Sequence, residues 1–222
     1  MAFFMAFLPP APHLSHMEHV ALHKTPGDVP PLQAMRRAEA EDAGRIFDHL
    51  LRLSVEDRSL RFCGAVREPT LRRQAENVAA GYPAGLLACS PEPGAPVRGM
   101  IEIARIGAWA EVALSVEPDW RGAGLAPRMM LAAARWARLR GIHVLEALTL
   151  PENGAMRGLG RKMGARSRMD DGMIRQMFDV DMLLRDELGP LPLEGGAHPV
   201  GPVAHLASVS NHRPADLRRA AA

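Results

Sequence analysis

The sequence contains little cysteine, few aromatic residues and almost no net charge. Its two cysteines, Cys63 and Cys89, lie far apart and outside any metal-ligand spacing, which argues against a disulfide framework. A formal net charge of +2 gives no bulk attraction to nucleic acid or to an anionic membrane. We therefore expect a cytoplasmic protein that acts without a metal, a nucleic acid or a membrane as its partner.

The chain also lacks a long apolar run. The first residues, MAFFMAFLPPAPHLSHMEHV, have no basic start, and Pro9 and Pro10 end their apolar stretch, so they fit neither a signal peptide nor a membrane span. We predict an extended or disordered segment over residues 1–31. Its histidines are compatible with metal binding, but histidines among prolines are more typical of disorder; they are His13, His16, His19 and His23.

The remaining residues are sufficient for one hydrophobic core. The chain has 222 residues, of which 47% are apolar, and this size favours a single main domain. We place that domain at residues 32–187. Residues 188–222 are rich in Pro, Gly and Ala and have no regular apolar period, so we expect a low-complexity tail.

Segments with the apolar spacing of strands and segments with the apolar spacing of helices follow one another along the domain. Short connections join the early strands, and a long helix joins two later ones, which together predict an α/β (α+β) fold with a mixed, mostly antiparallel central sheet flanked by helices. The expected strands are 32–38, 84–90, 97–107, 110–117, 143–150 and 173–182, and the expected helices are 39–54, 55–62, 67–81, 124–141 and 153–164.

The segment RGAGLA, residues 121–126, separates the strand 110–117 from the helix 124–141. Glycines before a helix allow an anion to approach the unpaired N–H groups of its first turn. A P-loop would need Lys and Ser or Thr where Leu125 and Ala126 stand, and Pro127 occupies the place of the third glycine of a dinucleotide fingerprint. The segment therefore predicts a phosphate-binding loop of another kind.

This loop resembles the Q/R-x-x-G-x-G/A signature of the GNAT superfamily of N-acetyltransferases, and the following strand ends in LTLPEN, as in that family. The resemblance covers roughly residues 33–183 and implies the GNAT fold, in which two parallel strands of the sheet splay apart. It further implies that acetyl-CoA is the co-substrate and that the loop amides bind its pyrophosphate. The cofactor-binding residues that it implies are Leu114, Val116, Arg121, Gly122, Ala123, Gly124, Leu125, Ala126 and Asn153.

Attack of an amine on a thioester needs a base that removes a proton from the ammonium group. Glu111 is an unusual residue inside an apolar strand, because burial of an unpaired carboxylate is costly. The segments AEVALSVEPDWRGAGLA and LSVEDRSLRF also resemble the branch that includes bacterial protein lysine acetyltransferases, which implies that Glu111 is the general base. Glu102 is a second candidate, and an ordinary strand residue bonded to an arginine is the alternative for Glu111.

The sequence departs from the family at the leaving-group side. Gly160 stands where a tyrosine commonly protonates the thiolate, and Ala165 replaces a phenylalanine. Two functions remain open: transfer of acetyl from acetyl-CoA to a primary amine, on a protein lysine or a small molecule, and non-catalytic binding of acyl-CoA by a sensor or regulatory module. Asp170 and Asp171 fit either attraction of the amine or a simple turn. We expect a monomer or a homodimer.

Overall fold

The computed structural model describes residues 34–89, 92, 94–185 and 193–194. The predicted N-terminal segment with its histidines, and most of the predicted tail, lie outside these residues. None of the helices formed by the described residues is long and apolar enough to cross a membrane.

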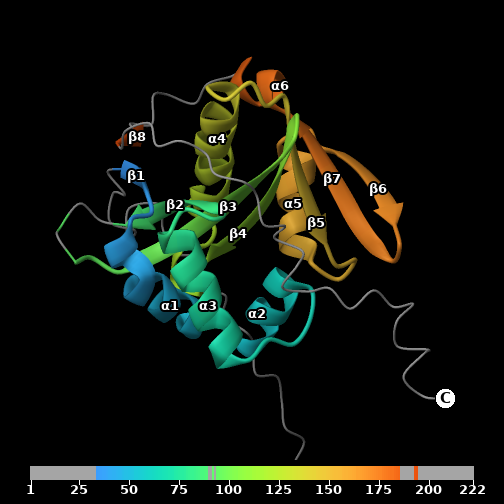
Figure 1. Cartoon of the computed structure of the whole chain (residues 1–222). Helices are drawn as coiled ribbons and strands as arrows, with labels where there is room; N and C mark the ends of the chain where they lie inside the picture. The colour runs from blue at the N-terminus through green and yellow to red at the C-terminus, as the bar shows by residue number, and fades with distance from the viewer. Residues whose placement is uncertain (1–33, 90–91, 93, 186–192, 195–222) are drawn as a thin grey trace, which may run out of the picture.

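A single mixed sheet forms the centre of the described molecule (Figure 1). Its strands follow the order β6-β7-β5-β4-β3-β2-β1-β8, and all neighbours are antiparallel except the pairs β4–β5 and β1–β8. The strands are β1 (Ala34–Arg37), β2 (Ala84–Cys89), β3 (Val97–Ile106), β4 (Trp109–Val116), β5 (Val144–Thr149), β6 (Arg166–Asp170), β7 (Met173–Asp179) and β8 (Leu193–Glu194).

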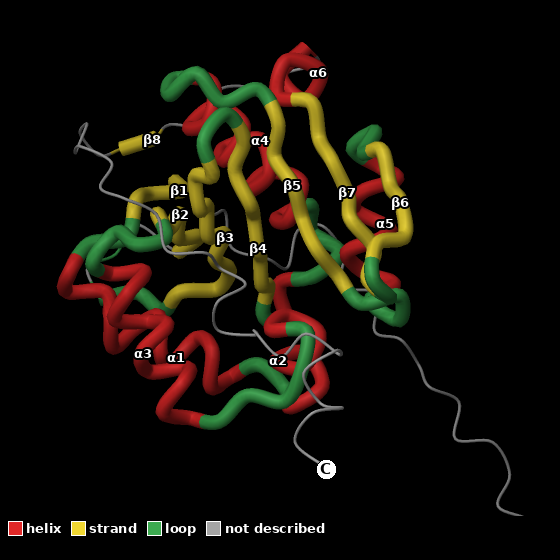
Figure 2. Tube along the Cα trace, turned by 45° about the vertical axis from the view of Figure 1, so that its right-hand side comes forward, coloured by secondary structure: helices red, strands yellow, loops and turns green. Residues whose placement is uncertain are grey.

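Helices cover both faces of this sheet. Helices α1 and α3 pack on one face, and α4, α5 and α6 contribute to the core on the other face. Helix α2 lies beside the end of β4 (Figure 2). The helices are α1 (Ala43–Arg52), α2 (Val55–Phe62), α3 (Glu68–Ala79), α4 (Leu125–Arg138), α5 (Gly154–Lys162) and α6 (Val180–Arg185), with 3-10 turns at Ala40–Asp42 and Pro118–Trp120.

The parallel pair β4–β5 is only partly formed. The two strands pair from Trp109 and Val144 as far as Glu111 and Glu146, although β4 continues to Val116 and β5 to Thr149. Beyond this point the strands diverge toward α2 (Figure 2). The predicted fold, a mostly antiparallel sheet with a splayed parallel pair, is therefore confirmed.

The predicted strand 173–182 is too long at its C-terminal end. β7 ends at Asp179 and α6 follows at once, because the Asp179 carboxylate accepts a hydrogen bond of 2.9 Å from the N–H of Met182 and so supports the first turn of that helix. The residues after Asp179 continue the alternation of apolar and polar residues, but in α6 Val180, Leu183 and Leu184 pack in the core beside α4.

Asp170 and Asp171 lie at a hairpin that joins β6 and β7. Asp171 and Gly172 have φ angles of 47° and 77°, which are the left-handed values of a tight two-residue hairpin turn. Arg175 binds the Asp170 carboxylate through Nε at 2.8 Å. The structure thus gives both aspartates a role in the turn and in the pairing around it.

Candidate active site

A cavity of about 380 Å³ opens where β4 and β5 diverge. Its wall combines the second half of β4, the end of β5, the loop before α4, and side chains from α2 and α5. Backbone N–H and C=O groups of β4 that face β5 have no strand partner beyond Glu111, so an extended molecule in the cavity can pair with them as an added strand would.

The loop 121–126 forms one end of this cavity. Gly122 and Gly124 have φ angles of 78° and 79°, in the left-handed region that favours glycine. A Cβ atom at either position would meet no other atom within 4 Å. The glycines are therefore needed for the backbone path of the loop, and the space beside them is open.

This loop fits an oxyanion. Gly124 is the N-cap of α4 and has no side chain to cap the helix, so the first N–H groups of the helix lack intrahelical partners. No backbone hydrogen bond between described residues outside the helices and strands uses an N–H of residues 122–126 as donor. Unpaired amides together with the helix dipole suit the diphosphate of a coenzyme A molecule.

Arg121 fixes the loop to its surroundings. Its Nε donates to the carbonyl oxygen of Val116 at 3.1 Å, and its Nη2 lies 2.9 Å from the Asp57 carboxylate on α2. Burial alone would raise the pKa of Asp57, but hydrogen bonds from Arg121 and Ser54 outweigh it and lower that pKa. Arg121 thus connects α2 to the end of β4 in addition to lining the cavity.

Most residues that the resemblance indicated lie in the cavity wall. Asn153 is also the N-cap of α5, where its Oδ1 accepts a hydrogen bond of 3.0 Å from the N–H of Met156. Ala123 and Glu111 do not line the cavity, and the residues that do are Leu114, Val116, Arg121, Gly122, Gly124, Leu125, Ala126 and Asn153.

Glu111 lies at the point where β4 and β5 separate. It is half-buried and shares a sheet face with Ala113 and Ser115, two residues of the cavity wall. Burial raises the pKa of the Cys63 thiol, at the end of α2, and the charge of Glu111 raises it further. Glu111 thus acts electrostatically on the end of α2, although it does not itself line the cavity.

Glu102 is committed to other partners. Its side chain is fully buried, and its Oε2 accepts a hydrogen bond of 2.6 Å from Gln74. Arg61 lies 2.7 Å from its Oε1 as an ion pair. These contacts occupy both carboxylate oxygens, which argues against Glu102 as the base.

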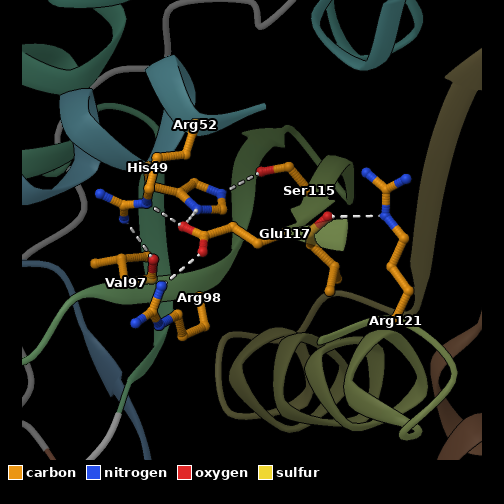
Figure 3. A network of polar contacts seen from close by, with 8 residues as sticks. His49, Arg52, Val97, Arg98, Ser115, Glu117 and Arg121 are labelled. Atoms are coloured by element: carbon orange, nitrogen blue, oxygen red, sulfur yellow. Dashed lines mark hydrogen bonds and ion pairs between the residues drawn. The ribbon is translucent and has the colours of Figure 1, made fainter. Parts of the chain in front are cut away.

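A buried polar network surrounds Glu117, immediately before the loop (Figure 3). Its Oε1 accepts hydrogen bonds from Arg52 at 2.7 Å and from His49 Nδ1 at 3.2 Å, and its Oε2 accepts one from Arg98 at 2.9 Å. Burial would raise the pKa of Glu117, but these bonds together lower it to about 2.

The charged Glu117 also fixes the tautomer of His49. With Nδ1–H donating to the carboxylate, Nε2 is the acceptor for the hydroxyl of Ser115 at 2.8 Å. The network joins α1 and β3 to the end of β4 and so holds the strand that leads into the loop. Sequence analysis missed it, because its members lie up to 68 residues apart in the chain.

The position of the family's tyrosine is filled by another side chain. A Cβ atom at Gly160 would lie 1.9 Å from Nε2 and 2.6 Å from Cδ of Gln176, which is itself only 1% exposed. A side chain at position 160 would therefore have to displace the end of the Gln176 side chain, which fills this place in the structure.

Comparisons with known proteins agree with this geometry. Residues 25–166 match the family model described as an acetyltransferase (GNAT) domain. No curated protein matches the chain.

Solved structures with the same fold include three informative ones. The GNAT domain of S. lividans PAT is 26% identical with a TM-score of 0.55, and the match covers 65% of this chain and 89% of that one. The ribosomal-protein-S5-alanine acetyltransferase from Vibrio fischeri is 13% identical with a TM-score of 0.52, covering 66% and 92%. The structure of yncA from Salmonella typhimurium with its cofactor acetyl-CoA is 18% identical with a TM-score of 0.51, covering 71% and 96%.

The match to the family model spans more than half of the chain and includes the splayed strands and the glycine loop. Acetyl-CoA is the acyl donor of this family. The chain belongs to the acetyltransferase (GNAT) domain family and is an acyltransferase.

Proposed function

We propose that this protein transfers an acetyl group from acetyl-CoA to a primary amine, with Glu111 as the general base. The observation that carries the proposal is the divergence of β4 and β5 directly after Glu111, which opens a cavity that ends at the glycine loop. Base, open strand edge and anion-binding loop follow one another along a single stretch of chain.

Different parts of the cavity wall bind different parts of acetyl-CoA. The amides of residues 122–126 hold the diphosphate, and the backbone of β4 at Leu114 and Val116 pairs with the pantetheine arm. Asn153 keeps its Nδ2 as a donor for the same arm, because its Oδ1 already caps α5. Arg121 acts mainly as a support for the loop through Asp57 and Val116.

Acetyl-CoA supplies an acetyl group that is activated as a thioester. Glu111 removes a proton from the ammonium form of the acceptor, so that the neutral amine attacks the carbonyl carbon. Its place at the point where β4 and β5 separate, on the sheet face of two residues of the cavity wall, favours this role. A thiol is acidic enough to leave without a phenolic donor, so the filled position at Gly160 is compatible with turnover at a reduced rate.

We further propose that a protein lysine is the first acceptor to test, and a small-molecule amine the second. Support comes from the resemblance of residues 53–62 and 110–126 to protein lysine acetyltransferases. Asp170 contributes little to recognition of the amine, since Arg175 neutralises it.

One observation favours a second function, that of a non-catalytic acyl-CoA sensor. Gln176 closes the place of the leaving-group donor, while the cofactor cavity is kept. Such a module would bind acetyl-CoA tightly without turning it over.

Release of free thiol from acetyl-CoA with a panel of lysine peptides and small amines separates the two functions. The enzyme predicts turnover that falls by about 10²- to 10⁴-fold in Glu111→Gln with unchanged binding of coenzyme A. Glu152→Gln is the matched control, because Glu152 is exposed and its charge, like that of Glu111, raises the pKa of Cys63. The Glu152→Gln variant should retain the activity. Tight binding without turnover on any amine would support the sensor instead.

A further inference from the structure

A group of basic side chains lies at the end of α4 that is opposite the glycine loop. Arg140 follows the helix directly, and Trp136 lies on its last turns. Arg37 on β1 and Arg105 on β3 each lie two positions after a core residue, Met35 and Ile103. They therefore share the sheet face that α4 covers. We refer to Arg37, Arg105, Trp136 and Arg140 as the arginine cluster.

The arginine cluster contains donors that are buried without an acceptor. Nη1 of Arg37, Nε1 of Trp136 and Nε of Arg140 are each shielded from water and have no hydrogen-bond partner among the residues that the structure describes. Trp136 itself is only 6% exposed. More than nine in ten buried polar groups in proteins are paired. Two unpaired donors on the stacked pair Trp136 and Arg140, with a third on Arg37, whose charge acts on Arg140, therefore indicate a missing acceptor.

The charges of the arginine cluster are also uncompensated. None of the ion pairs between described residues includes Arg37, Arg105 or Arg140. Burial lowers the pKa of Arg140, and the neighbouring charges of Arg37 and Arg105 lower it further. An anion at this place would relieve the repulsion and accept the free N–H groups together.

Local contacts hold the arginine cluster in position. The guanidinium of Arg140 lies 4.2 Å from the centroid of the Trp136 ring, and its Nη1 donates to the carbonyl oxygen of Trp136 at 3.2 Å. These contacts leave Nε of Arg140 as a fixed donor. A prearranged cationic site loses less side-chain entropy on binding than one made of freely rotating arginines.

We propose that the arginine cluster is a binding site for a phosphate-type oxyanion. Its free groups are all donors, they come from β1 and from the end of α4, and a tetrahedral oxyanion accepts hydrogen bonds from several directions at once. The C-terminal end of α4 opposes an anion with about half a negative charge, but three guanidinium groups exceed that effect.

This site is separate from the cofactor loop. The 14 residues of α4 span about 21 Å, so one phosphate group cannot occupy both ends of the helix. The proposal therefore stands even if the loop at residues 121–126 does not bind coenzyme A.

Calorimetric titration of the full chain with inorganic phosphate at constant ionic strength tests the site, in the presence and in the absence of coenzyme A. Saturable binding should persist when coenzyme A is present. Arg140→Gln should weaken it by about tenfold or more, and Trp136→Phe should weaken it less, since that change removes only one N–H donor. Arg138→Gln is the matched control, because Arg138 lies in the same turn, carries the same charge and is exposed.

Three outcomes would overturn the proposal. The first is absence of saturable phosphate binding by the parent protein, which needs no variant to fold. The second is equal weakening by Arg138→Gln, which would indicate general attraction to positive charge. The third is complete loss of phosphate binding when coenzyme A is added, which would place the phosphate in the glycine loop.

Discussion

The two sides of β4 are built in different ways. On the side of α1, Glu117 is held by three cationic or polar side chains at 2.7–3.2 Å, and almost no water reaches it. On the side of β5, the strand pairs with nothing beyond Glu111 and borders an open cavity whose end is shaped by two glycines.

This difference shows how one strand serves both stability and binding. Side chains of the Glu117 network fix the position of the strand, and the free backbone on the other side is then available for a ligand. Changes in the network should therefore alter folding, while changes at the cavity should alter cofactor binding.

The largest expected effect concerns removal of the Glu117 carboxylate. Glu117→Ala leaves His49, Arg52 and Arg98 without their shared acceptor, so we expect a loss of about 3 kcal/mol in the free energy of unfolding. Urea denaturation measures it. Glu111→Gln, on the same strand face, should lower that free energy by less than Glu117→Ala does, because Glu111 is only half-buried, and an equal loss for both would contradict the distinction.

The pH dependence of stability should follow from the same network. The pKa of Glu117 is lowered from 4.5 to about 2 in the folded protein, so its contribution is fully present above pH 4.5 and is lost as the pH falls toward 2. Urea denaturation of the parent and of Glu117→Gln should give a constant difference near neutral pH that shrinks over this acidic range. A difference that stays constant down to pH 2 would show that the carboxylate is not held in its charged form.

Substitutions at Gly160 test whether side-chain packing between α5 and β7 also contributes to the stability of the protein. Gly160→Ala places a methyl group against Gln176 and should destabilise the protein by about 1–3 kcal/mol in thermal or urea unfolding. Gly158→Ala, on the same helix, meets only the end of Arg161 at 3.9 Å and should be neutral or stabilising. Combination of Gly160→Ala with Gln176→Ala should recover part of the loss; no recovery would mean that Gln176 does not fill this position.

The smallest expected effect separates backbone strain from ligand binding. Gly124→Ala and Gly107→Ala both force alanine into left-handed backbone, at φ angles of 79° and 62°, and each should cost about 1–2 kcal/mol of stability. Only Gly124→Ala should also weaken coenzyme A binding, because Gly107 lies in the β3–β4 turn, away from the cavity wall. Similar affinities for the two variants, measured by calorimetry, would break the assignment of the loop.

Local patterns were sufficient for much of the fold and for part of the site. Helical spacing predicted α2 at residues 55–62 as it is observed, and the glycines of RGAGLA predicted the loop before α4, since conformational preference is encoded in neighbouring residues. The predicted strand 110–117 differs from β4 by one residue at each end.

Contacts between distant segments could not be predicted in this way. The bond between Arg52 and Glu117 joins residues 65 positions apart, and the contact of Gln176 with Gly160 depends on how α5 packs against β7. The α6 helix was missed because the cap at Asp179 interrupts a pattern that otherwise fits a strand. Such features depend on tertiary packing, which a single sequence does not display.

Calorimetric comparison of coenzyme A with pantetheine, which lacks the diphosphate, tests most directly whether the amides of residues 122–126 grip a diphosphate. We expect saturable binding of coenzyme A and binding of pantetheine that is weaker by about tenfold or more. Equal affinity for the two compounds, or no binding of coenzyme A, would contradict it.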